Sequence, residues 1–366
     1  MIDESRTAGA GGPLAPPVGW GIAGCGWVAR DHAAPALQAV DAACIVALYD
    51  PAQQALERMS AVLPSGGSNA APTCTTDLAA FLAAPDLDAV YVAAPNHAHR
   101  QVVEAATAAG KSVLCEKPLA AGEADAAAMV NACADAGVLL GTAYDQRWHP
   151  AHQRLRELLP SLGTITAVRI VYCCWLPPDW TPDGQPHDNW RADPARAGGG
   201  AAIDLGPHGL DLVGMLLDDD VVTLSALLQH QVHAYAVDDG ALLQGRTAGG
   251  VLVDLHVAYN TPDALPRRRL EVVGTRGVAV ATDTMGQVGG GRLTVQTVDS
   301  AEPVDVGFAA TSPFTAQFDA FSAAVQERGP WPYPADRDLR LHRLLLAALA
   351  AAHSVGTGHT GREART

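Results

Sequence analysis

The sequence predicts an α/β protein in which a doubly wound parallel sheet is followed by an α/β part whose strands pair mainly antiparallel. Three observations predict this arrangement. The chain of 366 residues exceeds what one hydrophobic core usually organises. Between residues 18 and 143, short apolar runs alternate with helix-length amphipathic stretches. After residue 148, the remaining strand-like runs fall in neighbouring pairs.

The first part contains apolar runs that are typical of strands buried on both faces. They cover residues 20–23, 45–48, 89–92, 112–115 and 138–140. Such runs, separated by helix-length stretches, indicate a parallel sheet with helices on both sides. We therefore expect one domain over residues 18–143. Residues 1–17 are rich in Gly, Pro and Ala, and we expect them to form a disordered tail.

The second part, residues 144–356, begins with a helical stretch that runs through residue 159. A strand over 165–172 and a loop rich in Trp and Pro, up to about residue 197, come next. Glycine-containing turns at 249–250 and 274–277 predict two hairpins and hence antiparallel pairing. Two helices with an apolar stripe, at about 313–327 and 337–354, follow, and residues 357–366 are expected to be a flexible tail.

Composition excludes several classes of partner. The formal charge of −15 repels nucleic acid and anionic membranes, and we expect the short run Arg267, Arg268 and Arg269 to be a solvated strand end. Seven cysteines without a C-x-x-C spacing indicate a reducing, cytoplasmic environment. No signal peptide is expected at the start of the chain, and the apolar run over 344–353 is too short to cross a bilayer.

A glycine-rich turn between the first apolar run and a helical stretch predicts a dinucleotide site. Gly24 permits a tight turn, Gly26 lets the backbone approach a pyrophosphate, and Ala29 allows close packing of helix on sheet. Trp27 and Val28 open the helix, whose N-terminus favours phosphate. The alternative is an ordinary glycine turn between strand and helix.

Asp50 ends the second apolar run, 24 residues beyond Gly26, where a carboxylate can accept hydrogen bonds from an adenosine ribose. The same carboxylate would repel a 2′-phosphate, and residues 51–55 contain no arginine to bind one. NAD is therefore favoured over NADP as the cofactor. The alternative is that Asp50 only caps the following helix.

Two further motifs carry groups for proton transfer. Glu116 and Lys117 follow the strand predicted at 112–115, at the carboxyl edge where such sheets bind ligands, although a surface pair before Pro118 is an equal alternative. Asp204 and His208 are four residues apart and share one face of a helix. The imidazole can take an alcohol proton and the carboxylate can orient it, although this pair alone would more often be structural.

With these motifs, the sequence resembles the Gfo/Idh/MocA family, named for glucose–fructose oxidoreductase and inositol dehydrogenase. The resemblance covers most of residues 18–355 and is most specific at 21–26, 94–99, 112–119 and 198–208. It implies a Rossmann domain, then an α/β domain with an open, largely antiparallel sheet that often mediates homo-oligomers. It also implies a catalytic set of Lys117, Asp204 and His208 beside the nicotinamide. Pro95, Asn96 and His99, with Glu116, would line the cofactor crevice, unless the first three simply initiate a helix.

The surroundings of the substrate are predicted less directly. Tryptophans near the domain junction can stack on a sugar ring, and polar residues beside them can hydrogen-bond it, although packing is the commoner role of each tryptophan. The candidates are Arg147, Trp148, Trp190 and Arg191, with Trp175, Trp180, Gln146, His187, Asp188 and Asn189 near them. Histidines and carboxylates cluster here, among them His149, His152, His187, Asp188, His208 and Asp211, but no tight ligand pattern occurs and no metal is expected.

The sequence thus predicts an NAD-dependent dehydrogenase or reductase that acts on a secondary alcohol or ketone of a sugar, cyclitol or polyol. One alternative uses the same groups to cleave a glycoside through transient oxidation of the ring. Another is a regulator that senses a dinucleotide without catalysis, which the presence of all three acid/base groups disfavours.

Overall fold

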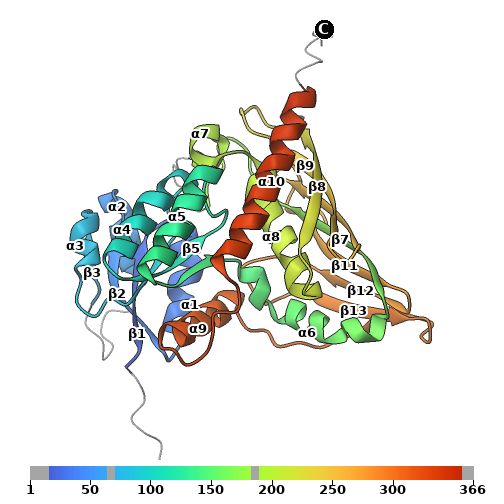
Figure 1. The fold of residues 1–366 in the computed structure, drawn as a ribbon, viewed down its shortest axis with the longest axis horizontal. Helices are drawn as coiled ribbons and strands as arrows, with labels where there is room; N and C mark the ends of the chain where they lie inside the picture. The colour runs from blue at the N-terminus through green and yellow to red at the C-terminus, as the bar shows by residue number, and fades with distance from the viewer. Residues whose placement is uncertain (1–15, 64–70, 183–188, 357–366) are drawn as a thin grey trace, which may run out of the picture.

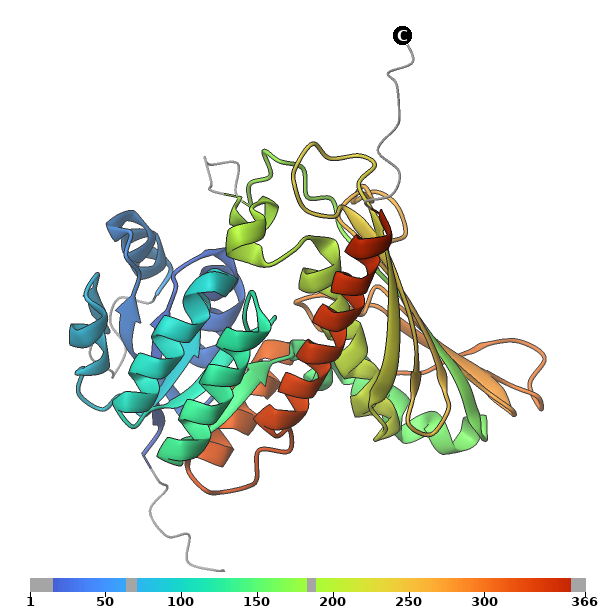
Figure 2. The same cartoon turned by 45° about the horizontal axis from the view of Figure 1, so that its top comes forward.

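The computed structural model describes residues 16–63, 71–182 and 189–356. Of the two expected tails, only residues 16 and 17 lie among the described residues. Two sheets lie side by side, with helices between them (Figure 1). Figure 2 shows the same arrangement after a turn of the molecule, with the long helix α10 (Ala335–Gly356) running along the junction.

The first sheet has six parallel strands in the order β3-β2-β1-β4-β5-β6. This order reverses between β1 and β4, which makes a doubly wound sheet and confirms the prediction. The strands are β1 (Val18–Ala23), β2 (Ala43–Tyr49), β3 (Thr73–Thr75), β4 (Ala89–Val92), β5 (Ser112–Glu116) and β6 (Leu140–Ala143). The sequence did not predict β3, because this short, largely exposed edge strand has no apolar run.

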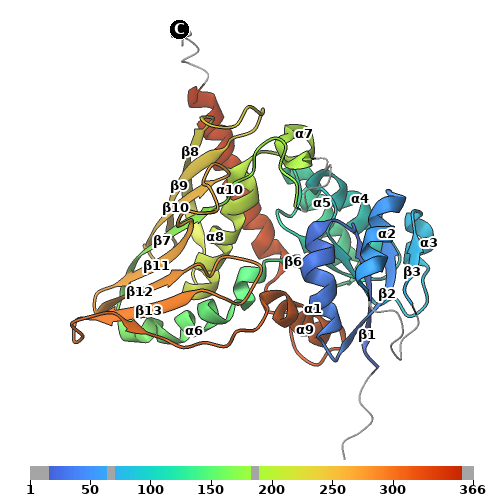
Figure 3. The same cartoon turned by 180° about the vertical axis from the view of Figure 1, so that it is seen from behind.

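Helices cover both faces of the first sheet, as parallel strands buried on both sides require (Figures 1 and 3). They are η1 (Ala29–Ala33), α1 (Ala34–Gln38), α2 (Gln53–Val62), α3 (Leu78–Leu82), η2 (Asn96–Ala98), α4 (His99–Ala108) and α5 (Glu123–Ala136).

The second sheet has eight strands in the order β14-β13-β12-β11-β7-β10-β9-β8. Only β7 and β10 pair parallel, so the sheet is largely antiparallel, as expected. The strands are β7 (Ile165–Cys173), β8 (Val221–Gln229), β9 (Gly240–Thr247), β10 (Leu252–Ala258), β11 (Arg268–Gly274), β12 (Gly277–Thr282), β13 (Arg292–Thr297) and β14 (Val304–Asp305). Both predicted hairpins are present, as β9–β10 and β11–β12.

Helices cover the face of the second sheet that is turned toward the first sheet, and the opposite face is open (Figures 1 and 3). The open face exposes apolar side chains, among them Leu227 and Leu242, which pair across β8 and β9. The remaining helices are η3 (Asp145–Trp148), α6 (Pro150–Leu158), η4 (Leu159–Leu162), η5 (Trp190–Ala192), α7 (Pro194–Ala197), α8 (Ala201–Leu217) and α9 (Pro313–Val325). Within the described residues, no helix is long and apolar enough to span a bilayer.

After the second sheet, the chain returns to the first. Helix α9 lies against the first sheet, where Phe318 packs edge-on against Trp20 and Tyr91 at ring distances of 5.2 and 5.1 Å. The indole Nε1 of Trp20 donates to Ser322 Oγ at 3.0 Å. The first hydrophobic core therefore contains residues from both ends of the described chain.

A buried ion cluster holds the junction together. Arg147 of η3 is fully buried and pairs with Asp211 of α8 at 2.8 Å and with Asp338 of α10 at 2.5 Å. Arg337 also reaches Asp211, at 2.6 Å. The ring of Tyr333 lies 3.9 Å from the Arg147 guanidinium carbon. Three segments that are distant in sequence, η3, α8 and α10, are thus tied together by largely buried charges.

We expect Arg147→Ala to lower the stability of the protein strongly. The change leaves two buried carboxylates facing the single guanidinium of Arg337, and breaking a buried pair in this way costs about 3–5 kcal/mol. Thermal unfolding, followed by circular dichroism, measures the effect.

The matched control is Arg340→Ala, which removes an exposed ion pair between Arg340 and Asp336, both on α10. Exposed pairs contribute little, so its melting temperature should stay near that of the wild type. Equal melting temperatures for the two variants would show that the buried cluster does not stabilise the junction.

Candidate active site

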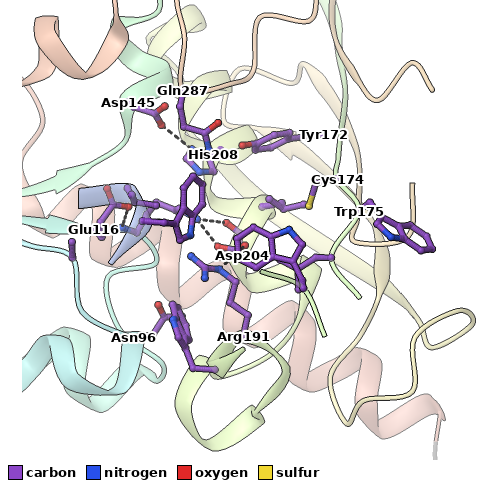
Figure 4. Close-up of a pocket in the computed structure, with 18 of the residues that line it drawn as sticks. Asn96, Glu116, Asp145, Tyr172, Cys174, Trp175, Arg191, Asp204, His208 and Gln287 are labelled. Carbon is purple, nitrogen blue, oxygen red and sulfur yellow. Dashed lines mark hydrogen bonds and ion pairs between the residues drawn. The ribbon is translucent and has the colours of Figure 1, made fainter. Parts of the chain in front are cut away.

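A cavity of about 250 Å³ lies between the carboxyl ends of the first sheet's strands and the helices and loops of the second part (Figure 4). Segments that follow β1, β4, β5 and β6 form one side, and α8, β7 and the start of β11 form the other. Open α/β sheets bind ligands at such a carboxyl edge, close to the point where the strand order reverses. The cavity is therefore the natural place for a cofactor and a substrate to meet.

The glycine turn after β1 has the geometry that a pyrophosphate needs. Gly24 has φ +99°, and a Cβ there would lie 2.6 Å from the carbonyl carbon of Ala93. A Cβ on Gly26 would meet nothing within 4 Å, so its backbone faces open space. Helical structure begins at Trp27, and Trp27 and Val28 line the cavity. The turn thus leaves room for phosphates beside the N-terminus of a helix.

Asp50 is tied to this turn. Its two carboxylate oxygens accept hydrogen bonds from the backbone amides of Cys25 and Ala52, both at 2.8 Å. The N-cap position of α2 is Ala52, so Asp50 binds the amide of the N-cap residue and no amide of the first helical turn. Each oxygen keeps a lone pair that can accept a ribose hydroxyl.

Glu116 and Lys117 both reach the cavity from the end of β5. The hydroxyl of Tyr91 donates to Glu116 Oε1 at 2.5 Å. Burial raises the pKa of Glu116, against the opposing effects of the Lys117 charge and the Tyr91 hydrogen bond. The peptide bond between Lys117 and Pro118 is cis.

Lys117 and Asp204 meet in the cavity across the junction between the two sheets. Lys117 Nζ donates to Asp204 Oδ1 at 2.5 Å and to the Asp204 backbone oxygen at 3.0 Å. The hydroxyl of Tyr259 donates to the other carboxylate oxygen at 2.7 Å, and Arg191 Nε lies 3.8 Å from it. Burial alone would raise the pKa of Asp204, but the charges of Lys117 and Arg191 and these hydrogen bonds hold it below its ordinary value. Asp204 is therefore an anion at neutral pH.

Helix α8 carries both Asp204 and His208 into the cavity, one turn apart. Its start is fixed by Asp238, whose carboxylate accepts hydrogen bonds from the amides of Gly200 and Ala202, both at 2.8 Å. A Cβ on Gly200 would overlap the Asp238 backbone, so this glycine permits a close approach. Of the three glycines at 198–200 that precede the helix, Gly198 and Gly200 are packed against neighbouring backbone.

His208 and Asp145 form a second buried pair beside Lys117. His208 Nδ1 lies 3.4 Å from Asp145 Oδ1 and has no hydrogen-bond partner among the described residues. Burial, and then the charge of Lys117, lower the pKa of His208, so the ring is neutral at pH 7. Burial, and then the charge of Glu116, raise the pKa of Asp145 to about 7. With Nδ1 turned to Asp145, Nε2 is the ring nitrogen left for a ligand.

The structure does not bring every candidate to the cavity. Asn96 lines it, and the Asn96 side-chain amide also donates to the Ala197 carbonyl at 2.8 Å. Pro95 is not on the wall, and His99 is fully buried with its two ring nitrogens at 2.9 and 3.2 Å from the carbonyl oxygens of Ala94 and Leu119. For His99 the alternative of a structural role in the helix start fits the contacts better.

Arg147 and Trp148 also lie away from the cavity. The guanidinium of Arg147 pairs with carboxylates of the buried ion cluster. Trp148 packs against Trp331 and Tyr333 at ring distances of 5.9 Å. Their expected contact with a substrate is therefore wrong, because both serve the junction. Trp190 and Arg191 do line the cavity, with the Arg191 guanidinium carbon 4.4 Å from the ring of Trp190. Trp175 and Trp180 line it as well.

Across the described part of the chain, no group of three or more His, Cys, Asp or Glu side chains is placed to hold a metal ion. His149 accepts from the amide of Ala151, and the ring nitrogens of His152 face Gln146 O and Thr284 Oγ1. His187 and Asp188 lie outside the described residues.

Sequence reasoning missed several residues of the site, namely Asp145, Tyr172, Arg267 and Arg268 on the cavity wall and Tyr259, which donates to Asp204. Arg267 and Arg268 line the cavity, so the expectation that the whole arginine run is a solvated strand end is wrong for these two. Arg269 alone is exposed. Because side chains alternate between the two faces of a strand, the sequence could have indicated that Arg268 and Arg269 point to opposite faces of β11.

Comparison with known proteins extends the resemblance. Residues 18–144 match the family model described as "Oxidoreductase family, NAD-binding Rossmann fold", and residues 152–280 match the model described as "GFO/IDH/MocA C-terminal domain". A 1,5-anhydro-D-fructose reductase of Ensifer adhaerens is 30% identical over 313 residues, which cover 85% of this chain and 89% of the relative.

Solved structures share the fold. A 3-ketoreductase from Actinomadura kijaniata, in complex with NADP and TDP-benzene, has a TM-score of 0.76 at 24% identity, over 91% of this chain and 97% of its own. A levoglucosan dehydrogenase, in complex with NADH and levoglucosan, has a TM-score of 0.77 at 21% identity, over 92% and 98% of the two chains.

We expect Asp145→Asn to stabilise the protein more at pH 8 than at pH 5. The pKa of about 7 lies above the ordinary value of 3.8, so the folded protein holds this proton between those values and its stability falls as the pH rises through that window. The loss between pH 5 and pH 8 is roughly 2–3 kcal/mol, and asparagine escapes it.

Melting temperatures of wild type and variant at the two pH values measure this effect. Asp135→Asn, on the exposed surface of α5, is the control and should show no such pH-dependent gain. A gain for Asp145→Asn that is the same at both pH values would contradict the raised pKa.

Proposed function

Because the chain belongs to the Gfo/Idh/MocA family of oxidoreductases, we propose that it transfers hydride between a nicotinamide cofactor and a secondary alcohol or ketone of a sugar, cyclitol or related polyol. The observation that carries the proposal is that Lys117, Asp204 and His208 line one cavity together with Trp27 and Val28, which directly follow the glycine turn. Relatives named as sugar and inositol oxidoreductases support this class of substrate.

Oxidation of an alcohol removes a hydride from carbon and a proton from oxygen. When bound, the nicotinamide accepts the hydride at its C4. The side chains must then hold the hydroxyl and take its proton. Two candidates face the same space, Lys117 Nζ and His208 Nε2, and each can accept or donate a proton at an oxygen placed between them.

The surroundings of these two groups favour a division of labour. Lys117 keeps two hydrogen bonds to Asp204, which hold Nζ in one position as a donor to the substrate oxygen. His208 is neutral, and a proton gained at Nε2 would be stabilised by Asp145 on the opposite side of the ring once that carboxyl is ionised. We therefore assign polarisation of the oxygen to Lys117 and proton removal to His208.

Asp204 and Tyr259 hold the side chain of Lys117 in position. The Tyr259 hydroxyl fixes one oxygen of the carboxylate, which leaves the other for Lys117. A buried ion pair with further hydrogen bonds keeps one geometry, and small displacements of acid/base groups lower the rate of reaction strongly.

The two alternatives have less support. Cleavage of a glycoside by transient oxidation would use the same groups, but the relatives are named as dehydrogenases and reductases. A sensor without catalysis would not need the buried, mutually bonded acid/base set. Assembly into homo-oligomers and a cytoplasmic location stay predictions.

NAD is the cofactor that we propose for this chain, on the ground that Asp50 stands where a 2′-phosphate would come. Its carboxylate is held at the turn by two backbone amides and would repel that phosphate. Similar structures contain either cofactor, NADP in the 3-ketoreductase and NADH in the levoglucosan dehydrogenase. The choice in this chain thus depends on its own residues.

We expect Lys117→Met and His208→Gln each to lower kcat by roughly 10²-fold or more, because each removes a group that acts on the reacting oxygen. The assay is formation of NADH from a panel of sugars and cyclitols. The sequence contains one other lysine, Lys111, whose Nζ donates to the Leu87 carbonyl away from the cavity, and Lys111→Met is the matched control. Wild-type turnover in both site variants would refute the proposed roles.

We expect Asp50→Asn to raise the ratio of kcat/KM for NADP to that for NAD by about tenfold, the equivalent of 1.4 kcal/mol, because the charge that opposes the 2′-phosphate is gone. Asparagine still accepts one of the two amide hydrogen bonds. Asp41→Asn, on an exposed turn, is the control. An unchanged ratio would show that Asp50 does not set the preference.

A further inference from the structure

Three arginines line the cavity, and they differ in their partners. Arg267 forms an ion pair with Asp263, and Arg191 lies 3.8 Å from Asp204. Arg268 has no carboxylate within ion-pair distance among the described residues, and its Nε is buried without a hydrogen-bond partner. A guanidinium without a counter-charge on a cavity wall destabilises the folded protein, unless a bound ligand pairs with it.

A glycine, Gly286, leaves room for the guanidinium of Arg268. A Cβ on Gly286 would overlap Arg268 Nη1, so glycine permits the close approach. Gly286 is itself held in place, since its carbonyl accepts from Gln146 Nε2 at 3.1 Å. The Arg268 guanidinium carbon lies 5.8 Å from the centre of the Tyr172 ring. These contacts fix Arg268 without neutralising it.

Arg268 also lies close to the proposed proton acceptor. After burial and the charge of Lys117, its charge further lowers the pKa of His208, and it opposes the burial that raises the pKa of Tyr172. Figure 4 shows Tyr172 and Gln287 beside His208, on the wall that belongs to the second part of the chain. A substrate whose hydroxyl reaches His208 would therefore place another of its substituents near Arg268.

We propose that Arg268 is an anion subsite of this cavity and that the substrate is a sugar or polyol bearing an oxyanion, a carboxylate or a phosphate. The inference rests on the proposed function and narrows its substrate class. A guanidinium donates two parallel hydrogen bonds to such a group, and this geometry gives both affinity and orientation. The oxyanion would take the donors that the protein leaves free.

The alternative is that Arg268 only packs over Tyr172. At 5.8 Å, the contact is near the outer limit for a cation over an aromatic ring. In that case a neutral sugar would bind as well as an acidic one.

The experiment compares D-glucose, D-glucuronate and D-glucose 6-phosphate, which share a ring and differ in charge at C6. Initial rates of NADH formation are measured with wild type, Arg268→Gln and Arg269→Gln. The last variant is the control, because Arg269 is exposed and pairs with Glu271. Glucuronate and the phosphate distinguish the two sources of the oxyanion.

We expect wild type to prefer at least one of the anionic sugars. Arg268→Gln should raise the KM of that sugar about tenfold or more while the KM of glucose changes less than about twofold. Arg269→Gln should change neither. The inference is overturned if wild type has equal kcat/KM for all three sugars, or if Arg268→Gln affects charged and neutral sugars alike.

A binding measurement separates this inference from the proposed function. The rise in melting temperature of the NADH-loaded wild type is recorded with each sugar, and no variant is needed. A larger rise with an anionic sugar than with glucose supports the subsite, even if no sugar is turned over, in which case only the proposed function fails. Equal rises, with turnover of glucose, leave the function standing and reject the subsite.

Discussion

The bond between Lys117 and Asp204 is the contact on which the cavity depends. Lys117 follows β5 of the first sheet and Asp204 lies on helix α8 of the second part, and their largely buried side chains meet at 2.5 Å. The Tyr259 hydroxyl donates to the other carboxylate oxygen of Asp204, so both charged groups of the pair have partners. Because a buried ion pair is tolerated only when its geometry is satisfied, this contact fixes the distance between the end of β5 and helix α8.

The short helix η3 links this contact to the rest of the molecule. Asp145, at its start, faces His208, while Arg147, two residues on, enters the buried ion cluster with Asp211 of α8. One turn of backbone therefore touches α8 at two points, once for the proposed chemistry and once for the fold. The ring of His208 is held between these points, and its orientation follows from packing as much as from its own hydrogen bonds.

Local pattern was enough to predict every strand of the first sheet except β3, the two hairpins and the helix that carries Asp204 and His208. Apolar runs and turn residues act over a few positions and leave a direct trace in the sequence. Arg147 and Trp148 were misjudged because the partners of each are more than sixty residues away, in α8, α10 and the segment near Trp331. The same holds for Arg268, whose place on the cavity wall is decided by which face of β11 turns inward. Asp145 and Tyr259 likewise gained a role only through tertiary contact.

Helix α9 has a consequence for how the protein is made. The first hydrophobic core needs Phe318 to cover Trp20 and Tyr91, so about three hundred residues separate the two sides of a single contact. Topologically, the entire second sheet is an insertion into the first domain. During translation, the nascent parallel sheet must leave the ribosome with one apolar flank uncovered until α9 arrives, whereas the second sheet is already complete. The second core in turn contains Leu345 and Leu349 of α10, so in the growing polypeptide both cores close only when the last two helices are made.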